Sequence, residues 1–136
     1  MPLTAAADRS VAFNTTNQKS RQPVAANQRP FQGSVVGWSV AGFIRALIAG
    51  DVFAGFNEKT VDTQDVSATD GVLLVNIDRG IMTVLLPITG VTRAHVGGRA
   101  NVYATDDGTF TFTATGNTWV GTIIGIDSPN IAVVQS

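Results

Sequence analysis

The sequence predicts an all-β fold, a small β-barrel or sandwich domain preceded by an extended N-terminal arm. From residue 88 onward, short apolar runs recur about every ten residues with turn residues between them, which is typical of such domains. All 14 glycines lie at Gly33 or later, so glycine-containing turns begin only there. The first 30 residues carry a net charge of +3, whereas residues 31–136 carry −4. The chain is therefore expected to divide into a basic arm and an acidic domain.

The arm is expected to span residues 1–33 and the domain residues 34–136. The arm contains Pro2, Pro23 and Pro30, and a polar run from Asn14 to Gln22. A segment of this composition buries too little apolar surface to offset the entropy of ordering it. We therefore expect the arm to stay disordered until it binds a partner.

The first part of the domain allows two readings. Several apolar residues between 40 and 47 fit a helical face, but three glycines and the β-branched and aromatic residues favour two strands joined near Ala41-Gly42. Ala49-Gly50-Asp51 is then expected to turn the chain into a strand over 52–56. Residues 57–71 are polar and predict a surface loop.

Hairpins are expected in the second half of the chain. Asp78-Arg79-Gly80 lies between two apolar runs and predicts a tight turn that joins them. Further strands are expected over 100–104, 109–115, 119–126 and 131–134, with turns at 106–108, 116–117 and 128–130. In the strand over 109–115, Phe110 and Phe112 alternate with threonines, so both are expected to face the core.

Composition excludes several classes of protein. The chain has no cysteine, so it forms no disulfides and has no thiolate chemistry. No apolar run approaches the roughly 20 residues that span a bilayer, so no membrane partner is expected. The N-terminal residues lack the charged and apolar regions of a secretory signal, so synthesis in a cytoplasm is expected.

The chain offers no constellation for catalysis or for a cofactor. His95 is the only histidine, and we expect a solvated or backbone-bonded imidazole in a loop, not part of a triad or zinc site. Asp62, Asp65 and Asp70 do not match a calcium loop, and no glycine motif suits a phosphate. We therefore expect a protein that is not an enzyme and that has no catalytic residues, no metal site and no cofactor.

The basic arm is expected to bind protein in preference to nucleic acid. Four cations could pair with phosphates, but they form no cluster of adjacent residues and the domain that follows is acidic. No basic residue flanks Phe110 and Phe112, so they do not suggest a base-stacking platform. Direct nucleic-acid binding is not expected.

Residues 96–110, VGGRANVYATDDGTF, and 115–121, TGNTWVG, resemble the head decoration proteins of tailed phages, which are small β-barrel cement proteins. Residues 48–53, IAGDVF, resemble a strand entry common in that family. The resemblance covers roughly residues 45–135 and leaves the arm unmatched. Gly98-Arg99 stands where the family often has an acidic residue.

The resemblance implies a non-enzymatic virion protein on the outer surface of an expanded icosahedral phage capsid. It would bind the major capsid protein and neighbouring copies of itself, as trimers or dimers, and would stabilise the head against internal pressure. An arm that becomes ordered on binding suits this role, since tethering to the domain adds affinity.

Six residues are candidate contacts with these partners. The cations are chosen on charge alone, and the two aromatic residues because aromatic side chains dominate interface energies. Phe31 could equally begin the core of the domain. The candidates are Arg9, Phe13, Lys19, Arg21, Arg29 and Phe31.

Two other functions remain open. A carbohydrate- or ligand-binding β module would need exposed aromatic residues around a groove, and both tryptophans, Trp38 and Trp119, are expected to be buried. Another minor head or tail protein would differ from a cement protein in its copy number per virion.

Overall fold

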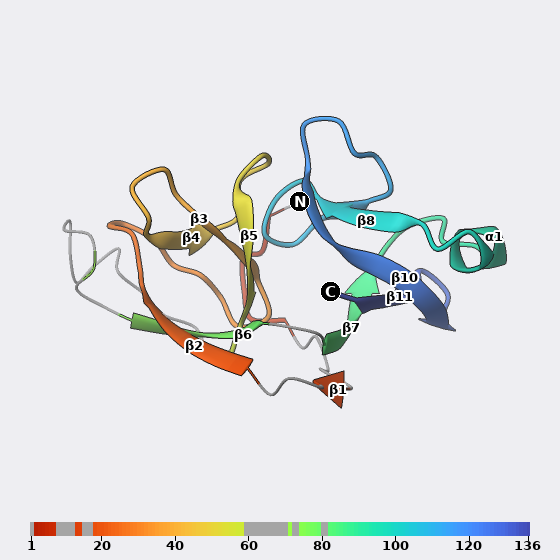
Figure 1. Ribbon diagram of the computed structural model, residues 1–136, viewed down its shortest axis with the longest axis horizontal. Coiled ribbons are helices and arrows are strands. Elements are labelled where there is room, and N and C mark those ends of the chain that lie inside the picture. The colour runs from red at the N-terminus through yellow and green to blue at the C-terminus, as the bar shows by residue number, and fades with distance from the viewer. Residues whose placement is uncertain (1, 8–12, 15–17, 59–70, 72–73, 80–81) are drawn as a thin grey trace.

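The computed structural model describes residues 2–7, 13–14, 18–58, 71, 74–79 and 82–136. The all-β prediction is confirmed: the strands form two antiparallel sheets, and the described residues include a single α-helix of five residues. The two sheets occupy the two halves of the molecule, and the N-terminal end of the chain lies between them (Figure 1). No closed barrel is formed by the described strands.

The six-stranded sheet has the strand order β1-β7-β11-β10-β8-β9. Its central strand β10 pairs with β11 on one side and with β8 on the other, and bulges interrupt both pairings. The strands are β1 (Phe13–Asn14), β7 (Met82–Pro87), β11 (Ile131–Gln135), β10 (Thr118–Ser128), β8 (Asn101–Ala104) and β9 (Phe110–Thr111).

The five-stranded sheet has the order β2-β6-β5-β3-β4. Its strands are β2 (Gln18–Pro23), β6 (Leu74–Arg79), β5 (Val52–Asn57), β3 (Val35–Trp38) and β4 (Ile44–Ala46). The end strands approach each other, since Val24, directly after β2, forms a parallel bridge with Ile44 and the Ala25 N–H donates to the Ile44 carbonyl at 2.7 Å. The sheet is therefore strongly curled.

Two hydrophobic clusters follow from this arrangement. The larger contains inward residues of the six-stranded sheet together with Val35, Leu47 and Phe56 from the five-stranded half. The smaller joins Val24, Val36, Ile44, Ala54 and Ile77, and Trp38 packs against it. Strands β3 to β6 supply every member except Val24, which directly follows β2. The five-stranded half therefore has a core of its own.

The hairpin expected around Asp78-Arg79-Gly80 is wrong. Asp78 and Arg79 belong to strand β6, where Asp78 pairs with Lys19 and with Phe56. The following strand, β7, pairs with β1 and β11 in the other sheet. The two apolar runs are adjacent in sequence, but β6 pairs with β2 and β5 and not with β7, so the chain crosses between the two sheets after β6.

Part of the segment expected to be an arm lies within the sheets. Strand β1 pairs with β7, β2 pairs with β6 along six residues, and Val24 is fully buried. In the structure, residues 18–24 are thus integral to the five-stranded half, and the expected boundary at residue 33 falls after two strands. Whether the first residues become ordered only on binding stays a prediction.

The remaining elements agree with the sequence in most respects. The strands near Ala41-Gly42, the turn before β5, and strands β8, β10 and β11 are confirmed. Strand β9 is only two residues long, although seven were expected. The expected loop around His95 is instead helix α1 (Arg93–Gly97).

Candidate functional site

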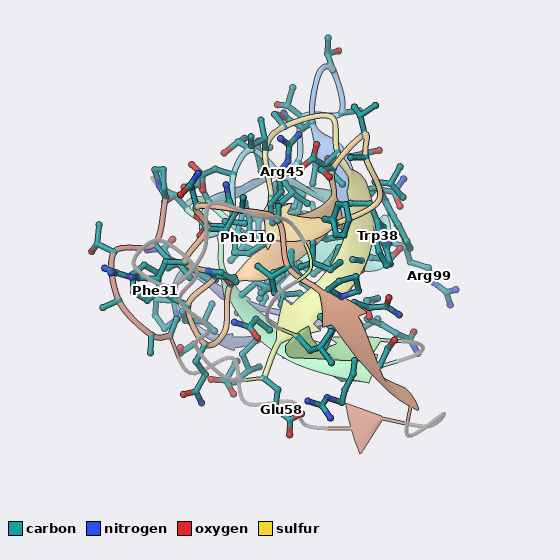
Figure 2. All side chains as sticks on the ribbon, turned by 90° about the vertical axis from the view of Figure 1, so that its left-hand side faces the viewer. Phe31, Trp38, Arg45, Glu58, Arg99 and Phe110 are labelled. Atoms are coloured by element: carbon teal, nitrogen blue, oxygen red, sulfur yellow. The ribbon has the colours of Figure 1, made fainter. Side chains whose placement is uncertain are left out.

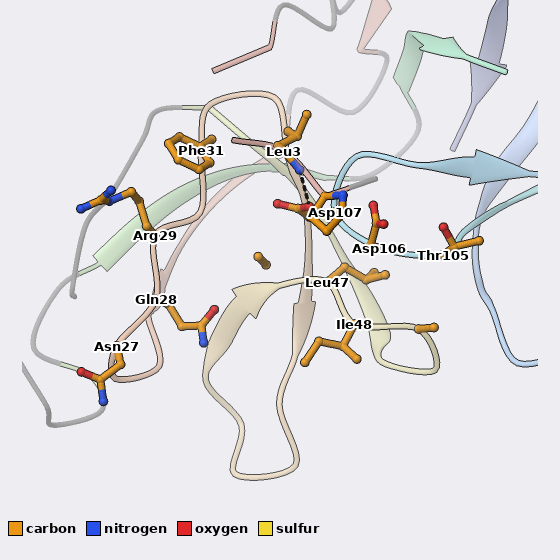
Figure 3. A pocket seen from close by; sticks show the side chains of 13 residues that line it. Leu3, Asn27, Gln28, Arg29, Phe31, Leu47, Ile48, Thr105, Asp106 and Asp107 are labelled. Carbon is orange, nitrogen blue, oxygen red and sulfur yellow. Dashed lines mark hydrogen bonds between the residues drawn. The ribbon is translucent and has the colours of Figure 1, made fainter. Parts of the chain in front are cut away.

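A cavity of about 530 Å³ lies where the N-terminal segment crosses the domain. Its walls come from four separate parts of the chain, as Figure 3 shows: the first residues, the segment before β3, the end of β4 with its following turn, and the turn after β8. The lining residues are Pro2, Leu3, Asn27, Gln28, Arg29, Phe31, Ala46, Leu47, Ile48, Ala49, Thr105, Asp106 and Asp107.

The cavity is lined by both apolar and charged residues. Leu47 is buried in the main core, whereas Ile48 is 54% exposed and leaves an aliphatic surface at the cavity. Arg29 lies on one side, and Asp106 and Asp107 lie on the other (Figure 3). The lining therefore combines aliphatic surface with charged residues of both signs.

Asp106 organises the turn at one wall. Its Oδ1 accepts the N–H groups of Gly108 at 2.9 Å and Thr109 at 2.8 Å. Partial burial acts to raise the pKa of Asp106, but hydrogen bonds to the carboxylate, among them those of Gly108 and Thr109, act to lower it, and the pKa lies below its ordinary value. Asp106 is therefore a turn-forming carboxylate that stays ionised, and the predicted turn at 106–108 is confirmed.

Asp107 connects the domain to the N-terminal segment. The residue is only 4% exposed, and its Oδ1 accepts the Leu3 N–H at 2.9 Å. Its backbone carbonyl accepts the Val35 N–H at 2.9 Å, which fixes the turn against β3. A buried carboxylate needs hydrogen-bond donors, so Asp107 favours a chain segment seated beside it.

The structure brings two of the six candidate contact residues together. Arg29 and Phe31 both line the cavity and are half-buried. Arg21 lies apart from them, exposed on β2. Phe13 and Lys19 lie in β1 and β2, but their side chains fall outside the described part of the chain, and Arg9 falls outside it altogether.

Asn57 positions the segment that carries Phe31, and the sequence did not reveal it. Its side chain donates to the carbonyls of Pro30 at 2.7 Å and Phe31 at 3.0 Å, and the residue is 3% exposed. It was expected to open a surface loop, because its sequence neighbours are polar. The structure instead ends β5 at Asn57 and uses its amide to satisfy buried carbonyls, as buried polar groups require.

A second candidate surface is the outer face of the six-stranded sheet around Trp119. The expectation that Trp119 is buried is wrong, because 46% of the residue is exposed. Tyr103 stands opposite it across the β8–β10 pair. Asn101 Oδ1 accepts hydrogen bonds from Trp119 Nε1 and Thr122 Oγ1, each at 3.3 Å. Gln135 lies opposite Thr122 on the neighbouring strand β11. We call the surface formed by Asn101, Tyr103, Trp119, Thr122 and Gln135 the Trp119 face.

A hollow of about 450 Å³ adjoins the Trp119 face. Thr122 and Gln135 belong to both, and Ile124, which is 48% exposed, and Arg99 extend the lining. Arg99 has φ of 50° and extends away from the ribbon in Figure 2. A residue other than glycine in this backbone region is uncommon, so Arg99 is held at some conformational cost at the edge of the hollow.

His95 has a structural role in the described part of the chain. Its Nδ1 accepts the Thr92 N–H at 3.0 Å, which caps the start of α1. Its ring stacks on Phe112, with centroids 3.9 Å apart and planes 10° from parallel. A backbone-bonded imidazole is therefore confirmed. Phe112 packs against the edge of the core and Phe110 lies within it.

The described residues contain no group of three or more side chains suited to a metal ion. Asp62, Asp65 and Asp70 lie outside the described residues. Within the same described ranges, no helix has the length and apolar character needed to cross a membrane.

Comparisons of the chain with protein-family models, with curated proteins and with solved structures found no match. The residues of the two candidate surfaces therefore carry the functional argument.

Proposed function

We propose that the chain is a head decoration protein, which binds the outer surface of an expanded icosahedral phage capsid and links neighbouring copies of the major capsid protein. The resemblance of residues 96–110 and 115–121 to that family is one support. The observation that carries the proposal is the Trp119 face, where a large exposed aromatic residue lies among the uncharged side chains of paired strands.

The chemistry of this face suits binding to another protein. Interface centres are enriched in tryptophan and tyrosine and depleted in charged residues, and a few such aromatic residues supply most of the binding energy. Trp119 and Tyr103 stand side by side on paired strands, with the amides of Asn101 and Gln135 close by. Sheet pairing fixes their backbones, so little entropy is lost when a partner covers them.

The test is co-sedimentation with expanded heads of the parent virus from which this protein has been stripped. We expect the full chain to pellet saturably, and Trp119→Ala to lose at least about tenfold in affinity, as replacement of a central aromatic residue typically does. Val40→Ala is the matched control, because Val40 is fully exposed at the β3–β4 turn. Failure of the unaltered chain to pellet would overturn the proposal.

Point variants are preferable to removal of the first 30 residues. That deletion would remove β2 and the buried Val24, and so open the five-stranded half. A loss of binding after such a deletion would not distinguish unfolding of the domain from loss of a contact with the partner.

A saccharide-binding module is a second candidate, and the exposure of Trp119 favours it. An exposed indole beside a hollow lined by Arg99, Thr122 and Gln135 offers an aromatic surface for a sugar ring together with hydrogen-bonding groups. Binding to a bacterial surface oligosaccharide on an array, lost in Trp119→Ala and without pelleting on heads, would establish this function. Pelleting with a low copy number per virion would instead indicate a minor head or tail protein.

A further inference from the structure

Residues 2–7, which we call the strap, are held on the domain at two points. Near its start, the Leu3 N–H donates to Asp107 Oδ1 at 2.9 Å. At its end, the Ala7 N–H donates to the Gln32 carbonyl at 2.7 Å. The surface that receives the strap, which we call the seat, consists of Gln32-Gly33 and Asp107-Gly108.

The seat has a glycine at each point of attachment. A Cβ on Gly33 would lie 1.9 Å from the Ala7 carbonyl oxygen, and a Cβ on Gly108 would lie 2.7 Å from Leu3 Cγ. Real Cβ atoms do not approach other atoms so closely, so Gly33 accepts no side chain while the strap is in place, and a side chain at Gly108 would displace the Leu3 side chain. The seat is therefore shaped to receive this segment, and its removal would leave buried Asp107 without one of its donors.

The strap also completes the cavity, because Pro2 and Leu3 form part of its wall. Without a seated strap, the wall next to Asp107 is missing. Whichever chain supplies the strap therefore supplies part of the site that contains Arg29 and Phe31.

Most of the strap is exposed. Pro2 and residues 4–6 are exposed, and the next described element is β1, a two-residue strand at the end of the six-stranded sheet. The integral part of the fold begins with β2, which pairs along six residues and leads into buried Val24. Exposed segments near the end of a chain open at a small fraction of the global unfolding free energy.

We propose that the strap is exchanged between copies, so that residues 2–7 of one chain occupy the seat of a second chain. The same hydrogen bonds and the same Leu3–Gly108 contact form in either arrangement, so exchange costs mainly the entropy of association. A shell on which copies lie side by side would reduce that cost through high local concentration. In this respect the inference rests on the proposed function, but exchange itself can be tested without capsids.

The absence of cysteine from the chain allows a direct test. Ala7→Cys in one affinity-tagged chain and Gln32→Cys in another place one thiol on the strap and one on the seat. The purified full-length variants are mixed at high concentration, oxidised and separated without reductant. We expect a mixed disulfide dimer, several-fold more abundant than in a mixture of Ala7→Cys with Gln135→Cys, where the second thiol lies on the Trp119 face.

A double variant that carries both cysteines in one chain shows whether the two thiols can reach each other. If it forms only an intrachain disulfide, and the mixture of single variants stays monomeric at every concentration, exchange is overturned. Because no capsid is present, this outcome leaves the sedimentation test of the proposed function unaffected. Equal yields of mixed dimer from the Gln32 and Gln135 variants would also overturn it, since the seat would have no preference.

Discussion

Arg45 and Asp51 form a two-point ion pair across the turn between β4 and β5. Arg45 Nε lies 3.0 Å from Asp51 Oδ2, and Nη2 lies 2.7 Å from Oδ1. Asp51 Oδ2 also accepts the Ile48 N–H at 3.1 Å, so one carboxylate holds both the arginine and the turn. The side chain of Asp51 is only 9% exposed, which makes this pair stronger than an ordinary surface pair.

Replacement of Asp51 by alanine is expected to lower the free energy of unfolding by about 1–3 kcal/mol, because it removes charge-assisted hydrogen bonds and leaves Arg45 without its carboxylate. Urea denaturation measures the change. Asp51→Asn should cost less, since the amide oxygen still accepts the Ile48 N–H. Asp127→Ala is the control, because Asp127 is exposed, and equal effects at the two positions would contradict the role of the ion pair.

Gly121 is expected to tolerate no side chain. A Cβ there would lie 2.6 Å from the Gln135 carbonyl oxygen and 2.7 Å from Val134 Cγ1, at the bulge in the central strand β10. Gly121→Ala should therefore destabilise the domain by about 1–3 kcal/mol, as overpacking of a core does. Thermal unfolding would show a lower Tm. Gly97→Ala is the matched control, because nothing lies within 4 Å of a Cβ at Gly97, and that variant should keep the original Tm or exceed it.

Arg99 is expected to lower the stability of the fold and to strengthen binding to stripped heads. Its φ of 50° suits glycine, so Arg99→Gly should stabilise the fold by up to about 1 kcal/mol. The same variant removes the cation beside the Trp119 face and should weaken binding to stripped heads. Denaturation and co-sedimentation of one preparation measure both effects. A variant that is more stable but binds as before would show that Arg99 makes no contact with the partner.

Asp106 is expected to make the domain sensitive to acid. Its pKa is lowered from 3.8, despite partial burial, by hydrogen bonds that include those of Gly108 and Thr109, so the folded state holds fewer protons than the unfolded state. The stabilisation is complete above pH 3.8 and is lost as the pH falls through the folded-state pKa.

Asp106→Asn should reduce this acid sensitivity. The free energy of unfolding, measured by urea at neutral pH and at a pH below 3.8, should differ less in the variant than in the unaltered chain. Asp127→Asn provides the comparison at an exposed carboxylate. An unchanged difference in Asp106→Asn would show that this carboxylate does not contribute.

His95 is expected to stabilise helix α1 in two ways, through the Thr92 cap and through its stack on Phe112. His95→Ala should cost about 1 kcal/mol, a typical value for a lost helix cap. His95→Phe retains an aromatic ring for the stack and removes the acceptor, so urea denaturation of both variants separates the two contributions. If neither variant changes the unfolding free energy, the cap and the stack are both unimportant for stability.

Local sequence features predicted most of the strands. Glycine and asparagine turns, such as those at Ala41-Gly42, Asp106-Asp107-Gly108 and Gly116-Asn117, mark where the chain reverses, because their backbone or side-chain chemistry favours a turn wherever it occurs. Alternation placed Phe110 in the core for the same reason, since side chains in a strand point to opposite faces in turn.

Which strands pair with one another could not be predicted from the sequence. Two apolar runs on either side of a glycine predict a hairpin, yet β6 and β7 lie in different sheets and pair with other strands. The predictions that Asn57 is exposed and that Trp119 is buried were wrong for a related reason. Burial depends on which other parts of the chain pack against a residue, and the polar or aromatic character of a side chain does not by itself indicate this.

The sequence by itself determined the all-β class, the positions of most turns and strands, and the absence of cysteine chemistry, because each depends on local backbone preference or on residue type. Only the tertiary structure decided that β2 is part of the fold, that Leu3 meets Asp107, and that Arg29 and Phe31 share a cavity. These relationships join residues far apart in the chain. They depend on sheet pairing and close packing, which favour one arrangement only when all the strands are present together.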